Sequence, residues 1–292
     1  MLFRSVQSAL SHWAKNEQRG HLFGFWFGHD MFTPPFVGPD GKFSYDRKLR
    51  EEMMTKPGKE LIYPEMTKDA VLFGGTDPGR FCPTYMIFCE SFIPPEKRRD
   101  PQFDRRDVYI ITQNALADAT YLMYIRAHYN RSTQPDPPFF AALRQQVPIP
   151  AFIADALDRL FTGIGAKIEA RRREEGVYPP KEIHTPSLED SQRAFEEYVT
   201  DAKRRLDHDQ KFPNEPKQIR PGEDVREERG RIQVSGQVAV MAINGLLTKV
   251  IFDKNPNHEF FVEESFPLDW MYPYLTPSGV IMKINQIGRA HV

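Results

Sequence analysis

Two short apolar segments, each followed by a polar loop and a helix-like pattern, constrain the fold of this chain most strongly. Residues 69–73 and 107–112 carry β-branched and aromatic side chains at successive positions, as strands buried on both faces do. Helical patterns follow at residues 83–92, where Pro83 suits a first turn, and at 117–129. This alternation predicts a parallel sheet with right-handed crossover connections.

The same alternation returns toward the C-terminus. Residues 233–253 have the pattern of a helix, 258–263 that of a strand, 267–275 that of a short helix and 279–284 that of a last strand. We therefore predict that the four strand segments share one sheet. The expected fold is a single Rossmann-like α/β domain over residues 6–286, with a mostly parallel sheet flanked by helices.

Residues 131–230 have a different character. Two long and highly charged helices are predicted at 152–174 and 188–207, joined by proline-rich loops. We interpret the region as a helical insertion or lid. Its charge runs at 171–175 and 203–205 are typical of solvated helix faces.

The composition is that of a globular protein, with 40% hydrophobic and 27% charged residues and a net charge of −1. This balance does not indicate nucleic acid as a partner. The longest apolar run, at residues 238–252, is interrupted by polar residues and is shorter than the roughly 20 residues of a membrane span. Cys82 and Cys89 lie too far apart along a predicted helix for a disulfide, so we expect two buried free thiols.

Both ends of the chain match translated sequencing adapters. Residues 1–5 and 287–292 are the peptides that two complementary adapters would encode. We predict that these ends are not native and that the chain is part of a longer protein.

In an open parallel sheet, ligands gather at the carboxyl ends of the strands. Polar loops at residues 74–80, 113–118 and 263–265 are expected to meet there. The candidate ligand-binding residues offer close backbone approach, hydrogen-bonding groups or a charge: Gly74, Gly75, Thr76, Asp77, Arg80, Gln113, Asn114, Asp118 and Glu264. Trp26, in an aromatic and glycine-rich stretch, is a further candidate. Its ring could stack on a sugar, or it could belong to the core.

The loop at residues 74–80 allows two interpretations. Asp77 could accept sugar hydroxyls or help to hold a cation, and Arg80 could bind a phosphate or carboxylate. Alternatively the loop is a helix-capping turn in which Asp77 satisfies local N–H groups and pairs with Arg80. The glycine spacing fits neither a dinucleotide fingerprint nor a Walker A loop. With no nucleophilic triad, carboxylate pair or Cys/His cluster in the sequence, we assign no catalytic or metal-binding residue and no cofactor.

Several longer motifs carry a resemblance to a known family. They are FGFWFG at residues 23–28, YPEM at 63–66, AVLFGGTDPGRFCPTYM at 70–86, DVYIITQNALAD at 107–118, GQVAVMAINGL at 236–246 and EESFPLDWMYP at 263–273. The motifs resemble the protein O-mannosyltransferase-like bacterial membrane glycosyltransferases, domain-of-unknown-function family 2723. The resemblance implies a multi-pass membrane parent that uses a lipid-linked sugar donor, with its catalytic carboxylates upstream of this chain.

On that basis the chain would be the soluble, extracytoplasmic region after the membrane helices. Its expected partners are the membrane half of the same polypeptide and a glycan or protein acceptor, which it would bind without catalysing transfer alone. The alternative is a free-standing enzyme or binding module for a phosphorylated sugar or a nucleotide, held by the loop at residues 74–80.

Overall fold

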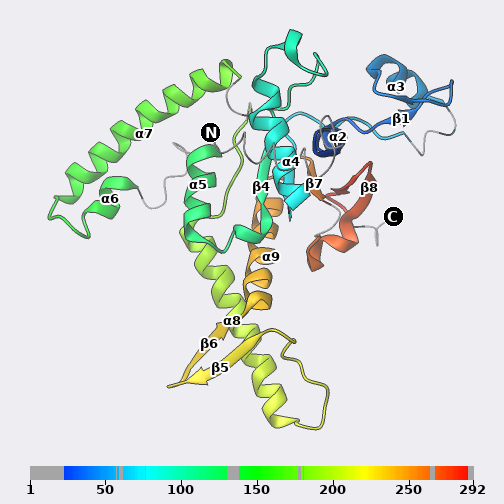
Figure 1. Cartoon of the computed structure of the whole chain (residues 1–292). Helices are drawn as coiled ribbons and strands as arrows, with labels where there is room; N and C mark the ends of the chain where they lie inside the picture. The colour runs from blue at the N-terminus through cyan, green and yellow to red at the C-terminus, as the bar shows by residue number, and fades with distance from the viewer. Residues whose placement is uncertain are drawn as a thin grey trace, which may run out of the picture.

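The computed structural model describes residues 23–56, 58, 62–75, 77–129, 138–176, 179, 181–263 and 267–288 (Figure 1). The adapter-like residues 1–5 and 289–292 lie outside these ranges. The chain folds as a mixed α/β protein whose central sheet has five strands.

The sheet combines parallel and antiparallel pairs in the order β4-β3-β7-β9-β8. The strands are β3 (Val71–Gly74), β4 (Tyr109–Thr112), β7 (Phe260–Glu263), β8 (Leu275–Ser278) and β9 (Ile281–Ile284). β3 pairs in parallel with β4 and β7, whereas β9 pairs antiparallel with β7 and β8. The prediction of four strand segments in one sheet is confirmed. The prediction of a mostly parallel sheet holds only in part: β3, β4 and β7 are parallel, but β9 runs antiparallel to both of its neighbours, and a tight turn at Gly279 (φ +67°) joins it to β8.

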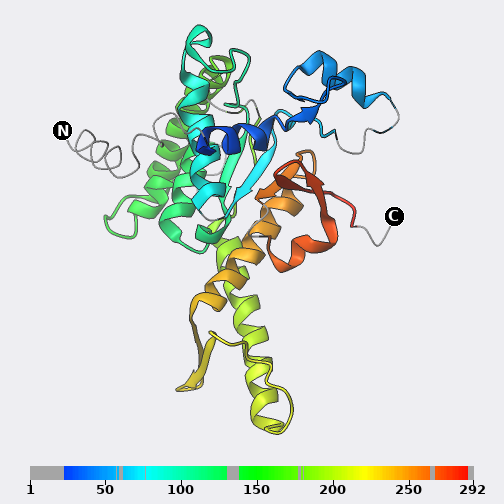
Figure 2. The same cartoon turned by 45° about the vertical axis from the view of Figure 1, so that its right-hand side comes forward.

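Side chains from alternate strand positions form two apolar layers. On one face, Phe73, Ile111 and Val262 pack with residues of α5 (Ala119–Tyr129) and α9 (Gln237–Lys254). On the other face, Leu72 and Phe261 pack with residues of α2 (Phe23–Phe32) and α4 (Asp77–Phe88). Helices therefore cover both faces of the sheet, which buries its central strands completely (Figure 2).

Two tyrosines of α5 occupy the outer edge of β4. The Tyr129 hydroxyl accepts from the Ile110 amide at 2.9 Å and donates to the Ile110 carbonyl at 3.0 Å. The Tyr121 hydroxyl accepts from the Thr112 amide at 2.6 Å. Backbone groups that β4 cannot use for pairing with β3 are thereby satisfied by side chains.

Several element boundaries differ from those predicted. α4 begins at Asp77, before Pro83, and ends at Phe88, where η2 (Glu90–Phe92) and η3 (Pro95–Lys97) follow. The aromatic stretch at residues 23–30 is helical, within α2. The described part of residues 33–60, a stretch rich in proline and glycine, contains β1 (Phe36–Val37), β2 (Phe43–Ser44) and α3 (Arg47–Met54). Both cysteines are free, but Cys82 is half-buried and Cys89 exposed, so their predicted burial is wrong.

The region at residues 131–230 is not entirely helical. Its described part contains α6 (Phe139–Leu143), α7 (Ala151–Glu174), α8 (Leu188–Lys211) and β5 (Asp224–Glu228). β5 pairs antiparallel with β6 (Arg231–Ser235), a segment partly assigned above to the helix that is now α9. α7 projects from the body of the molecule, and the β5–β6 hairpin lies beside α8 (Figure 1). None of the helices in the described ranges has the length and apolarity needed for crossing a membrane.

Candidate ligand-binding cleft

The carboxyl ends of β3, β4 and β7 lie at one edge of the sheet, as expected for parallel neighbours. From β3 the chain continues through α4 to β4 on one side, whereas β7 lies on the other side of β3. The strand order therefore reverses between β3 and β7. Crevices at such reversals are common ligand sites in α/β proteins.

The protein's own Glu263 fills this reversal point. A Cβ on Gly79, in the first turn of α4, would lie 2.2 Å from Glu263 Cγ and 2.8 Å from its Cβ. The Glu263 side chain is buried, with 5% exposed. A carboxylate beside the first turn of a helix is electrostatically favourable. The place where a ligand anion would approach α4 is thus already next to a protein carboxylate.

Gly74, the last residue of β3, is required by close backbone packing. A Cβ there would lie 2.6 Å from the Gly79 carbonyl oxygen. Pro83, four residues after Gly79 inside α4, has no N–H for that carbonyl. Gly74 and Gly79 therefore serve the junction between β3 and α4, while the neighbouring Gly75 is buried.

The loop after β4 consists of η4 (Gln113–Ala115) and the start of α5. Gln113 is fully buried and Asn114 half-buried. Asp118 caps α5, because its Oδ1 accepts from the Tyr121 amide at 2.9 Å. The Asn244 side chain of α9, also fully buried, accepts from the Ala117 amide at 2.6 Å. Asn244 was not among the predicted site residues, since nothing in a helical sequence pattern marks it as a loop anchor.

The remaining predicted residues are dispersed. Arg80 is exposed on α4, with its guanidinium carbon 5.6 Å from the centre of the Phe81 ring. Trp26 stacks on Tyr45 at 5.5 Å, in an aromatic cluster of α2. Thr76, Glu264 and the side chain of Asp77 lie outside the described part of the structure. The described loop residues therefore serve mostly in packing and capping.

A cleft of about 670 Å³ opens shortly beyond the carboxyl end of β7. Its walls are α8, the N-terminal half of α9 and the segment 267–270, which leads into η5 (Asp269–Tyr274). Apolar side chains line its interior, including Met241, Leu246 and Leu268. Sequence reasoning missed this cleft, because its walls come from segments far apart in the chain and share no motif.

Trp270 forms a fixed aromatic surface in the cleft. Its Nε1–H donates to the hydroxyl of Thr248, a fully buried residue, at 3.0 Å. Its ring packs at 5.2 Å from Phe252, and Lys249 Nζ lies 5.7 Å from its centroid. The hydrogen bond and the packing hold the indole in one orientation.

The α8 wall of the cleft carries a preorganised polar network. Arg205 donates to Glu223 Oε1 at 2.6 Å and to Asp201 Oδ2 at 2.8 Å, and Tyr198 donates to Glu223. Burial acts to raise the pKa of Glu223, but the hydrogen bonds from Arg205 and Tyr198 lower it to about 2. Glu223 is therefore ionised at neutral pH and serves to position Arg205.

The mouth of the cleft is more open. Arg220 Nη1 lies 3.9 Å from Asp269 Oδ2, and both side chains are exposed. Glu197 and Gln237 also line the cleft and are exposed. Hydrogen-bond donors and acceptors thus surround an apolar and aromatic interior.

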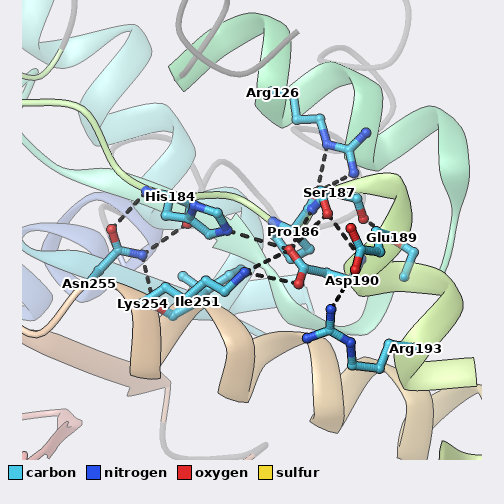
Figure 3. A network of polar contacts seen from close by, with 11 residues as sticks. Arg126, His184, Pro186, Ser187, Glu189, Asp190, Arg193, Ile251, Lys254 and Asn255 are labelled. Atoms are coloured by element: carbon cyan, nitrogen blue, oxygen red, sulfur yellow. Dashed lines mark hydrogen bonds and ion pairs between the residues drawn. The ribbon is translucent and has the colours of Figure 1, made fainter. Parts of the chain in front are cut away.

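A polar network fixes the other end of the α8–α9 pair (Figure 3). Ser187 Oγ accepts from the Asp190 amide at 3.0 Å, and Asp190 accepts from the Ser187 amide at 2.9 Å. Lys254 donates to Asp190 at 2.9 Å. Burial acts to raise the pKa of Asp190, but the hydrogen bonds from Ser187 and Lys254 hold it well below its usual range. The start of α8 is thereby fixed to the end of α9. This contact holds the two helices together at a distance from the cleft, which is lined by the middle of α8 and the N-terminal half of α9.

A second titratable cluster lies on the α2 side of the sheet. His29, with 1% exposed, is placed between Asp30 at 3.5 Å and Asp100 at 3.4 Å. The Tyr45 hydroxyl donates to Asp30 at 2.9 Å. Because the imidazole is enclosed, we interpret this cluster as an internal clamp between α2 and the chain around Asp100.

The described residues contain no group of three or more His, Cys, Asp and Glu side chains arranged to hold a metal ion. The fold and the cleft together define a mixed α/β protein with a polar-rimmed apolar cleft. Comparison with protein-family models, with curated proteins and with solved structures finds no match to the chain.

Proposed function

We propose that this chain is a Rossmann-like glycan-recognition domain and that the cleft between α8 and α9 is its binding site. One observation carries the proposal: a fixed indole, Trp270, lines a cleft of about 670 Å³ with ionic side chains at its rim. A sugar ring offers an apolar C–H face and a rim of hydroxyls. Stacking on Trp270 would use the face, while Asp201 and Arg220 would hydrogen-bond to the hydroxyls.

The protonation states of Glu223 and Asp201 argue against a general-acid role for either carboxylate. A general acid must hold a proton near its operating pH, and Glu223 does not, since its pKa lies at about 2. Asp201 is also held ionised: burial acts to raise its pKa, and hydrogen bonds from Arg204 and Arg205 outweigh that effect and lower it. Ionised carboxylates and guanidinium groups are suited to binding hydroxyls.

The motif resemblance extends this proposal to a whole protein. In the whole protein that we propose, the domain is extracytoplasmic. It acts beside the membrane half of the same polypeptide, and that polypeptide is a glycosyltransferase that uses a lipid-linked donor. The cleft would hold the glycan or the protein acceptor. The alternative ligand, a phosphorylated sugar or nucleotide at residues 74–80, is less well supported, because Glu263 already places a carboxylate beside the first turn of α4.

A panel of neutral oligosaccharides, measured by a glycan array and by calorimetry, tests the proposal. We expect binding to be lost or weakened at least about tenfold by Trp270→Ala, the scale of an aromatic hot spot. Trp26→Ala is the matched control, because Trp26 is also partly exposed but lies in another cluster. Arg220→Gln removes an exposed rim cation without disturbing the core and should also weaken binding.

Three outcomes would overturn the proposal: no oligosaccharide binds, Trp26→Ala weakens binding as much as Trp270→Ala, or Arg220→Gln has no effect on the bound sugar. Binding of phosphorylated sugars that is abolished by Arg80→Gln would instead establish the alternative.

A further inference from the structure

Helix α7 exposes a continuous row of large apolar side chains. Ile153, Leu160, Phe161, Ile164 and Ile168, here named the α7 stripe, have exposed fractions of 40%, 57%, 55%, 46% and 51%. Their spacing, mostly in steps of three, four or seven residues, places them on one side of a helix. α7 projects from the sheet and its covering helices (Figure 1). Contiguous apolar surface of this kind marks an interaction site.

The helix that carries the stripe is anchored. Asp158 accepts from the backbone amides of Phe140 and Ala141 at 2.9 Å each, which caps α6 and fixes it against α7. Phe140 also lies 5.6 Å from Phe161, ring centre to ring centre. At the other end, Arg173 donates to the carbonyl oxygen of Lys181 at 2.8 Å. The stripe is thus an outward face held in place by the rest of the chain.

Most of the charged side chains nearest the stripe are cations. By helical spacing, Lys167, Arg171 and Arg172 lie closest to it, near its C-terminal end. Asp155, Asp158 and Glu169 project from the opposite side of α7, whereas Glu174 lies on the flank that carries Lys167. Arg171 contacts Glu175 at 2.9 Å, yet its side chain is 80% exposed. A partner for this face should therefore be apolar at its centre and anionic beside the three cations.

We propose that α7 docks onto a lipid bilayer that contains anionic lipids, with the α7 stripe entering the boundary between headgroups and acyl chains. Amphipathic helices with cations beside an apolar face bind such surfaces in this orientation. The lipid phosphates would meet Lys167, Arg171 and Arg172. A second copy of the chain is less well matched, because its own α7 stripe offers no row of carboxylates to these cations. This inference is independent of the glycan proposal.

Vesicle co-sedimentation of the whole chain tests the inference. The probes are vesicles of phosphatidylcholine alone and of an equimolar mixture with phosphatidylglycerol. We expect binding to the mixed vesicles that Leu160→Ser with Ile164→Ser weakens by about tenfold or more, since both side chains lose their apolar burial. Arg171→Gln with Arg172→Gln should also weaken it by about tenfold or more, and should reduce its dependence on salt.

Phe152→Ser is the matched control, because Phe152 is 72% exposed on α7 but lies off the stripe. It should leave vesicle binding nearly unchanged. The proposal is overturned if no vesicle binding occurs or if Phe152→Ser weakens binding as much as the stripe variant. It is also overturned if light scattering shows a dimer that Leu160→Ser with Ile164→Ser dissociates, since a second copy would then cover the stripe.

Discussion

Glu263 lies against Gly79 so closely that a Cβ on residue 79 would lie 2.2 Å from Glu263 Cγ. The end of β7 and the first turn of α4 therefore interlock at the point where the strand order of the sheet reverses. This contact gives the first of five predictions, all of which concern the interactions that hold the fold together.

Gly79→Ala should destabilise the protein by about 1–3 kcal/mol, because the backbone of β7 or α4 must shift to admit a methyl group. Denaturant unfolding measures the free energy. Gly163→Ala is the control: Gly163 lies inside α7 with open space around its would-be Cβ, so the change should stabilise by up to about 1 kcal/mol. Equal effects of the two substitutions would show that the packing at Glu263 is looser than described.

Asn244→Ala should cost about 1–3 kcal/mol, since the fully buried Asn244 side chain no longer accepts from the Ala117 amide. Hydrogen exchange gives a local readout. In the variant, the Ala117 amide should exchange faster than in the wild type, while the amides of β3 should keep their protection. Asn257→Ala, at an exposed position, is the control and should change stability little. Unchanged exchange at Ala117 would contradict the anchoring role of Asn244.

Glu223→Gln should destabilise the protein by about 1.5–3 kcal/mol, because the buried Arg205 loses one of its two carboxylate partners and keeps only Asp201. Asp224→Asn removes one member of the exposed Asp224–Arg226 pair and should cost less than about 1 kcal/mol. Thermal unfolding of the two variants makes the comparison. A small loss for Glu223→Gln would mean that the α8 wall does not depend on this ion pair.

The pH dependence of stability should reveal His29. Burial acts to lower the pKa of His29, but the hydrogen bonds and charges of Asp100 and Asp30 raise it above its ordinary value of about 6.5. A group whose pKa is higher in the folded state stabilises fully below the unfolded pKa and loses that effect as pH rises through the folded pKa. The stability difference between the wild type and His29→Gln should therefore shrink from mildly acidic to alkaline pH.

His128 supplies a contrast of sign for that measurement. Burial lowers its pKa, so its contribution should be lost as pH falls below about 6.5. The difference between the wild type and His128→Gln should accordingly shrink toward acid. A His29 difference that is flat with pH would show that the imidazole remains neutral between its two carboxylates.

The strands were predictable where burial dominated the sequence. Residues 71–74 and 109–112 are apolar on both faces, because helices cover both faces of the central strand β3 and of the edge strand β4. The β5–β6 hairpin was not predicted, because its strands are half-exposed and carry charges that resemble a solvated helix. Pro83 suggested the first turn of a helix, but α4 begins at Asp77 and includes it.

The candidate site was less predictable than the sheet. Asp118 suits a ligand loop and a helix cap equally well by residue type, and only the bond to the Tyr121 amide identifies it as a cap. The cleft depends on tertiary contacts that join Tyr198, Met241 and Trp270 from three separate segments. Local spacing carries no signal for such a surface.

The backbone groups at the two edges of the sheet are blocked, and this bears on aggregation. On β4, the hydroxyls of Tyr121 and Tyr129 already occupy the outward backbone groups, so another chain finds no free row of donors and acceptors. On β8, the opposite edge, Pro277 is exposed and offers no N–H. Strand addition, the usual start of edge-to-edge aggregation, is therefore blocked on both sides by ordinary side chains. The sheet is closed to growth even though it is open in topology.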